Sequence, residues 1–232
     1  ELGKELVDSV SEDLLNQMIL RSSITGERIP TESAALIRIQ RTPLREVATV
    51  QTSAPGYPRV VQQVAVHRFI KRVDFATRVL KDASAHIETF IAFPFALEQP
   101  RFRYEGTLSV SEPGVNQFPG SNTDYHAVQH WASVEDGGCC VTLTSLEAAV
   151  LQFGGNWPLY VSQAHHGVTP PKFGSPFHDP AQVAKGHIYA LVLLNNYRTN
   201  FTPYQTGEAL FRFSLTSFPP DPSGGRSRDF GY

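Results

Sequence analysis

The chain has 232 residues, of which 41% are apolar, and a formal charge of −2. That length and apolar content allow a substantial core in one large or two small domains, which argues against global disorder. Lys and Arg are dispersed instead of forming a basic stripe, so nucleic-acid binding is not expected. No apolar run approaches the roughly 20 residues of a membrane-spanning helix, and no signal segment is apparent. We expect a soluble chain without a membrane partner, and its localisation stays unknown.

Short strands with period-2 alternation dominate the predicted elements. Only the segment from Ser11 to Leu20 has a helical pattern, with Ser11 as a candidate N-cap. The runs that come next are separated by Pro, Gly or charged residues, as in an antiparallel meander. They cover residues 34–40, 46–52, 59–69, 73–80 and 85–93. Further strands are predicted at 101–109, 125–134, 139–144, 148–153, 187–194 and 208–216.

These elements, with 17 Gly, 17 Pro and many β-branched and aromatic residues, predict an all-β fold, a large antiparallel β-sandwich. Helix content should stay below about 15%, and Phe93, Phe95 and Trp131 should be mostly buried. Residues 1–218 form the predicted sandwich domain. Residues 219–232, which contain Pro-Asp-Pro-Ser-Gly-Gly, are expected to be a C-terminal tail or linker. The irregular segment 164–185 is long enough to be functional, part of an interface, or mobile.

The two cysteines, Cys139 and Cys140, are adjacent in an apolar stretch. Neighbours on a strand point to opposite faces, so a disulfide between them would strain the backbone. We therefore expect packed, reduced thiols. A metal or redox site would need further cysteines, and the chain has none.

Several motifs occur in an order that resembles one family. They are Phe93-Pro94-Phe95, the Asn-Gln-Phe-Pro-Gly-Ser of 116–121, the Tyr-His-Ala-Val-Gln-His-Trp of 125–131, the Val-Leu-Gln-Phe-Gly of 150–154, and the Asn-Asn-Tyr of 195–197 with Thr-Asn-Phe at 199–201. Together they resemble the β-sandwich region that follows the catalytic domain in glycoside hydrolase family 38, the α-mannosidases and their bacterial relatives. The resemblance spans most of the chain.

This resemblance implies a very large twisted β-sandwich, a supersandwich similar to the galactose-mutarotase-like sugar-binding folds. It also implies that the chain begins in the middle of a longer polypeptide. The expected partners are a carbohydrate, namely an α-mannoside-type glycan, and an upstream catalytic domain of the same polypeptide or complex. Zinc is expected in that catalytic domain, and no cofactor is expected in this chain.

Residues 116–131 supply the first candidate carbohydrate site. Sugar recognition needs amides, carboxylates and hydroxyls for directional hydrogen bonds, and aromatic faces for the apolar side of a pyranose. On a strand, Asp124 and His126 would share one face and Trp131 would occupy the other. We expect Trp131 to pack inward and Asp124 and His126 to lie at the rim of the site. The alternative is that Asp124 caps a turn and His126 is an ordinary surface residue.

The second candidate carbohydrate site consists of Asn195, Asn196, Tyr197 and Asn200. These residues follow a predicted apolar strand, at a position where binding residues are common. The family resemblance predicts a tryptophan before the Thr-Asn pair, whereas this chain has Arg198, which puts a stacking role in doubt. The alternative is that the amides close a β-turn.

No catalytic residue is expected. A retaining glycosidase needs two carboxyl groups roughly 5 Å apart, and no motif singles out such a pair. The clustered His165, His166, His178, Asp179 and His187 lack the compact helical spacing of a hydrolytic zinc site, so no metal site is expected. The Gly-x-Ser-x-Gly elbow and the phosphate-binding glycine motifs are absent from the sequence.

Three functions stay open. The first is a non-catalytic β-sandwich portion of an α-mannosidase-like hydrolase, which contributes to carbohydrate binding and supports the catalytic domain. The second is a stand-alone carbohydrate-binding module. The third is a structural domain or a mutarotase-like epimerase, which would need a histidine base and a glutamate acid such as His126 and Glu112. The first predicts an exposed apolar face that includes part of the segment 164–185, and a uniformly polar surface favours the second.

Overall fold

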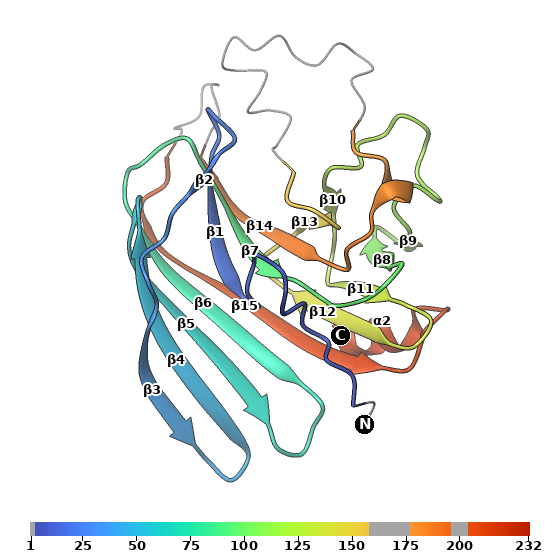
Figure 1. The fold of residues 1–232 in the computed structure, drawn as a ribbon, viewed down its shortest axis with the longest axis horizontal. Helices are drawn as coiled ribbons and strands as arrows, with labels where there is room; N and C mark the ends of the chain where they lie inside the picture. Colours follow the sequence, from blue (N-terminus) through green and yellow to red (C-terminus); the bar gives the residue numbers. More distant parts are fainter. Residues whose placement is uncertain (1–2, 158–176, 196–203) are drawn as a thin grey trace.

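The computed structural model describes residues 3–157, 177–195 and 204–232. Within these ranges the chain forms two antiparallel β-sheets that enclose a common core (Figure 1). In spatial order, the six-stranded sheet consists of β10 (His126–Ala127), β13 (Val150–Phe153), β14 (Ile188–Asn195), β7 (Ile87–Phe93), β1 (Gln17–Ser22) and β2 (Arg28–Ile29). The nine-stranded sheet consists of β3 (Ala35–Arg41), β4 (Arg45–Ala54), β5 (Tyr57–His67), β6 (Val73–Lys81), β15 (Gly207–Phe218), β12 (Cys140–Ser145), β11 (Trp131–Glu135), β8 (Arg101–Gly106) and β9 (Ser109–Ser111). The predicted antiparallel β-sandwich is confirmed.

Helical structure is minor in the described part of the chain. It consists of the 3₁₀ turn η1 (Pro180–Gln182) and the seven-residue helix α2 (Gly225–Gly231). The helix predicted between Ser11 and Leu20 is wrong, because residues from Gln17 onward form β1 and pair with β7. Three consecutive apolar side chains from Met18 to Leu20 are buried there, so sheet pairing outweighs the local helical pattern.

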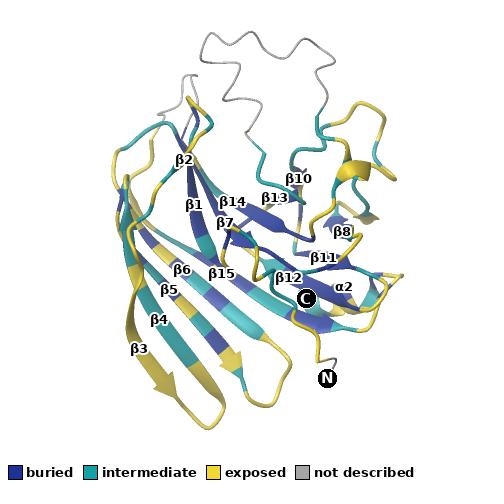
Figure 2. Ribbon diagram, viewed as in Figure 1, coloured by how far each residue is buried: buried dark blue, intermediate teal, exposed yellow. Residues whose placement is uncertain are grey.

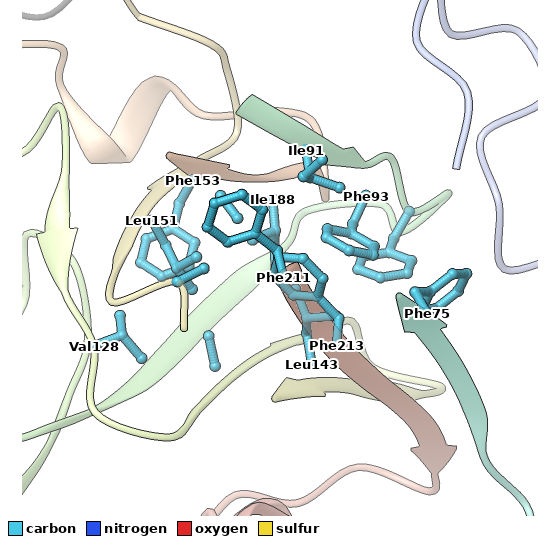
Figure 3. Packing of buried hydrophobic residues seen from close by; sticks show 14 of the residues in the cluster. Phe75, Ile91, Phe93, Val128, Leu143, Leu151, Phe153, Ile188, Phe211 and Phe213 are labelled. Carbon is cyan, nitrogen blue, oxygen red and sulfur yellow. The ribbon is translucent and has the colours of Figure 1, made fainter. Parts of the chain in front are cut away.

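Aromatic side chains from both sheets form the centre of the core (Figure 3). Phe93 of β7 lies with its ring centroid 5.6 Å from that of Phe75 and 4.9 Å from that of Phe213 in the opposite sheet. Phe93, Phe95 and Trp131 are only 0%, 2% and 1% exposed, which confirms the predicted burial. Truncating a buried Phe to Ala costs about 3–5 kcal/mol, so this cluster holds the two sheets together.

The predicted meander holds for β3 to β6 and fails at β7. Strands β3, β4, β5 and β6 pair in sequence order, whereas β7 crosses to the other sheet and lies between β14 and β1. All seven residues of β7 are buried. A strand covered on both faces cannot be assigned to a sheet by alternation, because neither face is polar.

The predicted strand 125–134 is two strands in different sheets. β10 pairs with β13, and β11 pairs with β8 and β12. Between them the N–H of Val128 donates to the carbonyl of Ala149 at 2.8 Å, and the N–H of Gln129 donates to the carbonyl of Glu105 at 3.0 Å. The chain therefore crosses between the two sheets just after His126.

The last residues, 219–232, expected to be a tail or linker, pack against β11 and β12. Asp221 is 5% exposed, and its Oδ2 accepts hydrogen bonds from the N–H groups of Arg226 and Ser227. A Cβ added at Gly231 would lie 2.6 Å from Cδ1 of Trp131, so α2 covers that indole closely. Helix α2 therefore buries Trp131 on the side of the nine-stranded sheet away from the core, so the expectation that Trp131 packs inward is wrong.

Strands β3 to β5 extend beyond the six-stranded sheet; β3 is exposed throughout, and β4 and β5 are partly exposed (Figure 2). The β-ladder aligns Ile39 through Ala48 and Val64 with Phe75 of the core, so Ile39 lies on the inner face. Ile39 is nevertheless 51% exposed, and Val66 on the same face is 55% exposed. An exposed apolar face is thus present on these strands, whereas most of the segment 164–185 lies outside the described residues.

Cys139 and Cys140 are free and buried. Burial raises the pKa of Cys139, and it raises that of Cys140 to about 11. The prediction of packed, reduced thiols is confirmed.

Candidate functional site

A pocket of about 270 Å³ opens between the loop that begins at Glu112 and the segment 178–183. Its floor is aromatic, with the rings of Phe102 and Phe153 5.0 Å apart. Gly114 has a φ of +73°, and a Cβ there would lie 2.9 Å from Cβ of Pro180, so the two segments meet where only glycine fits. The polar residues of the lining are Arg101, Glu112, His178 and Asp179. We call this hollow the His178 pocket.

The imidazole of His178 is held in place by Asp124. Oδ1 of Asp124 accepts hydrogen bonds from the backbone N–H of His178 at 2.8 Å and from its ring Nδ1 at 3.0 Å. A carboxylate on Nδ1 fixes a proton there and leaves Nε2 as the nitrogen available to a ligand. The side chains of Asp124 and His178 retain only 17% and 11% of their exposure. Asp124 therefore orients a histidine that lines the pocket.

Trp157 supports His178 from the other side. The two rings are stacked, with centroids 4.6 Å apart and planes 19° from parallel. Gln152, which is fully buried on β13, donates from Nε2 to the carbonyl of Trp157 at 2.8 Å and accepts from its N–H at 3.0 Å. The indole also lies against Gly155, where a Cβ would come within 2.5 Å of the ring. These contacts hold Trp157 in place, and its ring in turn positions His178.

Glu112 is unsuited to be a proton donor. Its carboxylate accepts hydrogen bonds of 2.9 Å from Arg101 and from Nε of Arg103. Burial alone would raise the pKa of Glu112, but these guanidinium groups outweigh that effect and lower it. A histidine and glutamate acid/base pair of the mutarotase type therefore lacks its acid at this position.

His126 lies beneath the pocket instead of at its rim. It is 3% exposed, and its ring packs against those of Tyr104 and Phe153. Burial lowers its pKa to about 4, so the imidazole is neutral. The rim position expected for His126 is wrong, because pairing of β10 with β13 turns this side chain into the core.

Of the second group of predicted residues, Asn195 lies within the described part of the chain. Asn195 is 5% exposed at the end of β14, and its carbonyl accepts a hydrogen bond from the N–H of His86. The opposite end of β14 pairs with Phe153 at the pocket floor, so Asn195 lies away from the His178 pocket. Asn196, Tyr197 and Asn200 lie outside the described residues.

Of the predicted site residues that the structure describes, Asp124 alone lies beside the pocket, where it holds the lining residue His178. His178 and Trp157 were not predicted as binding residues. The sequence gave one weak signal for His178, which is its place in the long irregular segment 164–185. Its contact with Asp124, 54 residues away, has no sequence signature.

Within the described part of the chain, no three His, Cys, Asp or Glu side chains gather closely enough to hold a metal ion. Among the same residues, no helix is long and apolar enough to cross a membrane.

Comparison with known proteins gives likenesses of fold only. No family model matches the sequence, and no curated protein matches it. An α-mannosidase from Enterococcus faecalis V583 superposes with a TM-score of 0.62 over 93% of this chain at 10% identity. A protein in glycosyl hydrolase family 38 from Enterococcus faecalis gives 0.63 over 93%, also at 10% identity. The chain has the fold of one portion of these proteins.

That portion is about a quarter of each relative, since the chain spans 26% and 28% of their lengths. The resemblance to family 38 proteins is therefore confirmed at the level of the fold. A putative aldose 1-epimerase from Escherichia coli K12 gives a TM-score of 0.42 over 84% of this chain and 78% of its own, at 10% identity.

Proposed function

We propose that this chain is the non-catalytic β-sandwich portion of an α-mannosidase-like glycoside hydrolase, which binds carbohydrate through the His178 pocket and supports a catalytic domain. The likeness of fold to a quarter of two longer proteins supports the architectural part. The hydrogen bonds from His178 to Asp124 carry the binding part, because they present a fixed imidazole to a concave, largely apolar pocket. The ligand is an α-mannoside-type glycan.

The lining suits a sugar in both polarity and size. Hydroxyl groups need fixed donors and acceptors, which Nε2 of His178 and the Arg101–Glu112 pair supply, and the apolar side of a pyranose needs an apolar wall. Phe102 and Phe153 provide that wall. Pockets for drug-sized ligands begin at about 300 Å³, so a pocket of about 270 Å³ suits a single sugar ring.

Binding is tested by calorimetric titration with methyl α-mannoside. The His178→Ala variant should bind about tenfold more weakly than the unmodified chain, because a directional hydrogen bond is removed. His130→Ala is the matched control, since His130 also pairs with a carboxylate, Glu105 at 2.9 Å, but lies outside the pocket lining. Equal losses of affinity in both variants, or no heat of binding in any of them, would contradict the assignment.

Catalysis by the chain alone is not expected, because it supplies no motif for a nucleophile and the Glu112 carboxylate is held ionised. The test is hydrolysis of a chromogenic α-mannoside at neutral and mildly acidic pH, with zinc and with a chelator. We expect no turnover. Turnover that disappears on Asp124→Ala would place a catalytic centre in this chain and overturn the non-catalytic assignment.

A further inference from the structure

The edge formed by β3 differs from the other sheet edges of the described chain. The six-stranded sheet ends in the two-residue strands β10 and β2, and the nine-stranded sheet ends on one side in the three-residue β9. Its other edge is β3, which has seven residues, all of them exposed (Figure 2). Proteins protect sheet edges by keeping them short, because unpaired backbone groups accept another strand. β3 lacks that protection.

The backbone groups at this edge can be identified from the ladder. The N–H of Thr42 donates to the carbonyl of Arg45 at 2.9 Å, which makes these residues a hydrogen-bonded pair. Such pairs alternate along antiparallel strands, so Gln40 bonds to β4, while Ile39 and Arg41 direct their N–H and C=O groups to the open side. In the described part of the chain β3 pairs with β4 alone.

An apolar hollow lies beside the open edge on the inner face of the sheet. It has a volume of about 450 Å³, and Ile39, Ala48, Val64 and Val66 contribute its apolar lining from β3, β4 and β5. Side chains on alternate positions of an added strand would face the same way as Ile39. A strand with apolar residues at those positions would therefore extend the inner face and cover this hollow.

The charge at this edge selects the partner. Arg38, Arg41 and Arg45 are exposed here, and the described residues offer them a single ion pair, from Nε of Arg41 to Glu46 at 3.4 Å between two exposed side chains. By the ladder, Arg38 lies on the outer face with Gln40, whereas Arg41 lies on the inner face with Ile39, opposite Glu46. Carboxylates on the outer face of an added strand would complement Arg38.

We propose that β3 accepts an extended segment of a partner protein, in which carboxylate and apolar side chains alternate, as an additional strand of the nine-stranded sheet. Its backbone would bond to Ile39 and Arg41, its apolar side chains would cover the hollow on the inner face, and its carboxylates would face Arg38 on the outer face. Strand addition of this kind takes affinity from the backbone and specificity from alternate side chains. This binding surface is independent of the His178 pocket.

The test uses a fluorescent heptapeptide of alternating Glu and Val, capped at both ends, and measures its anisotropy with increasing amounts of the full chain. We expect saturable binding that Arg38→Glu weakens about tenfold. Arg59→Glu makes the same charge change at an exposed position of β5 and should leave the affinity unchanged. The same peptide with alternate backbone nitrogens methylated should bind at least about tenfold more weakly, because it cannot complete the ladder.

Four outcomes would overturn the proposal. The first is no saturable binding, and the second is equal binding of the methylated peptide. The third is an equal effect of the two charge reversals, which would show a general attraction between opposite charges. The fourth is a different binding partner whose binding is lost in Arg38→Glu and kept in Arg59→Glu. Sedimentation velocity would reveal a second copy of the chain as that partner, and flotation with vesicles of phosphatidylcholine and phosphatidylserine would reveal a membrane surface.

Discussion

Replacing Asp124 tests the group that orients His178. Asp124 accepts two hydrogen bonds from His178, of 2.8 and 3.0 Å, in a site where both side chains are largely buried. A hydrogen bond to a charged group contributes about 1.5–3 kcal/mol, and the residual exposure of both side chains places each bond at the low end. Asp124→Ala should therefore lower the free energy of unfolding by about 2–3 kcal/mol. Asp124→Asn should lower it by about 1 kcal/mol, because one amide oxygen still accepts from the backbone N–H.

Equilibrium unfolding in urea measures these differences, with Asp229→Asn as the control. Among the described residues, Asp229 pairs with Arg228 alone, on the surface where both side chains are exposed, so its replacement should cost less than about 0.5 kcal/mol. Long-range nitrogen–proton NMR reports separately whether the proton of His178 is on Nδ1. An Asp124→Ala variant as stable as the control, or a neutral His178 with its proton on Nε2, would refute the reasoning.

Three further predictions concern residues around the two sheets. Gly155→Ala should destabilise the chain by about 1–3 kcal/mol and shift the fluorescence of Trp157, because the new Cβ would lie 2.5 Å from that ring; unchanged urea unfolding and emission would contradict the close approach. Cys139 and Cys140 should react with a thiol reagent only after unfolding, since burial raises both pKa values, and rapid labelling of the native chain at about pH 8 would show that they are accessible. Burial alone would raise the pKa of Asp13, but hydrogen bonds from a guanidinium and a phenol outweigh it and hold the pKa below 3.8. The stability that Asp13 contributes is therefore present above that pH and disappears as the pH falls through the folded pKa. Asp13→Asn should flatten the decline of the urea midpoint between about pH 5 and about pH 2. Parallel declines in the variant and the unmodified chain would contradict this.

The sequence predicted the sandwich because alternation and punctuation are local signals. Strands β4 to β6 are half-exposed, so their polar and apolar positions alternate visibly. β7 is buried on both faces and gave no signal for its sheet. The break after His126 was missed because apolar and polar residues continue through it, although the chain changes sheets there.

The candidate site was predictable only in part. Asp124 was identified from its place after a turn, but its partner comes from a segment 54 residues further along, and such a pairing depends on the assembled sheets. The sequence pattern placed His126 on the same strand face as Asp124, yet the register of β10 buries the His126 ring. A residue pattern specifies which side chains share a face, and pairing of the strands decides whether that face is solvent or core.

Mapping of methyl α-mannoside by NMR chemical shifts tests most directly whether the His178 pocket is the carbohydrate site. Saturable shifts should gather at Arg101, at Glu112 with the loop that follows it, and at the segment 178–183, and Asp124→Ala should weaken them together. Strand β3 should be unaffected. Shifts centred elsewhere in the chain, or none at millimolar sugar, would contradict carbohydrate binding at this pocket.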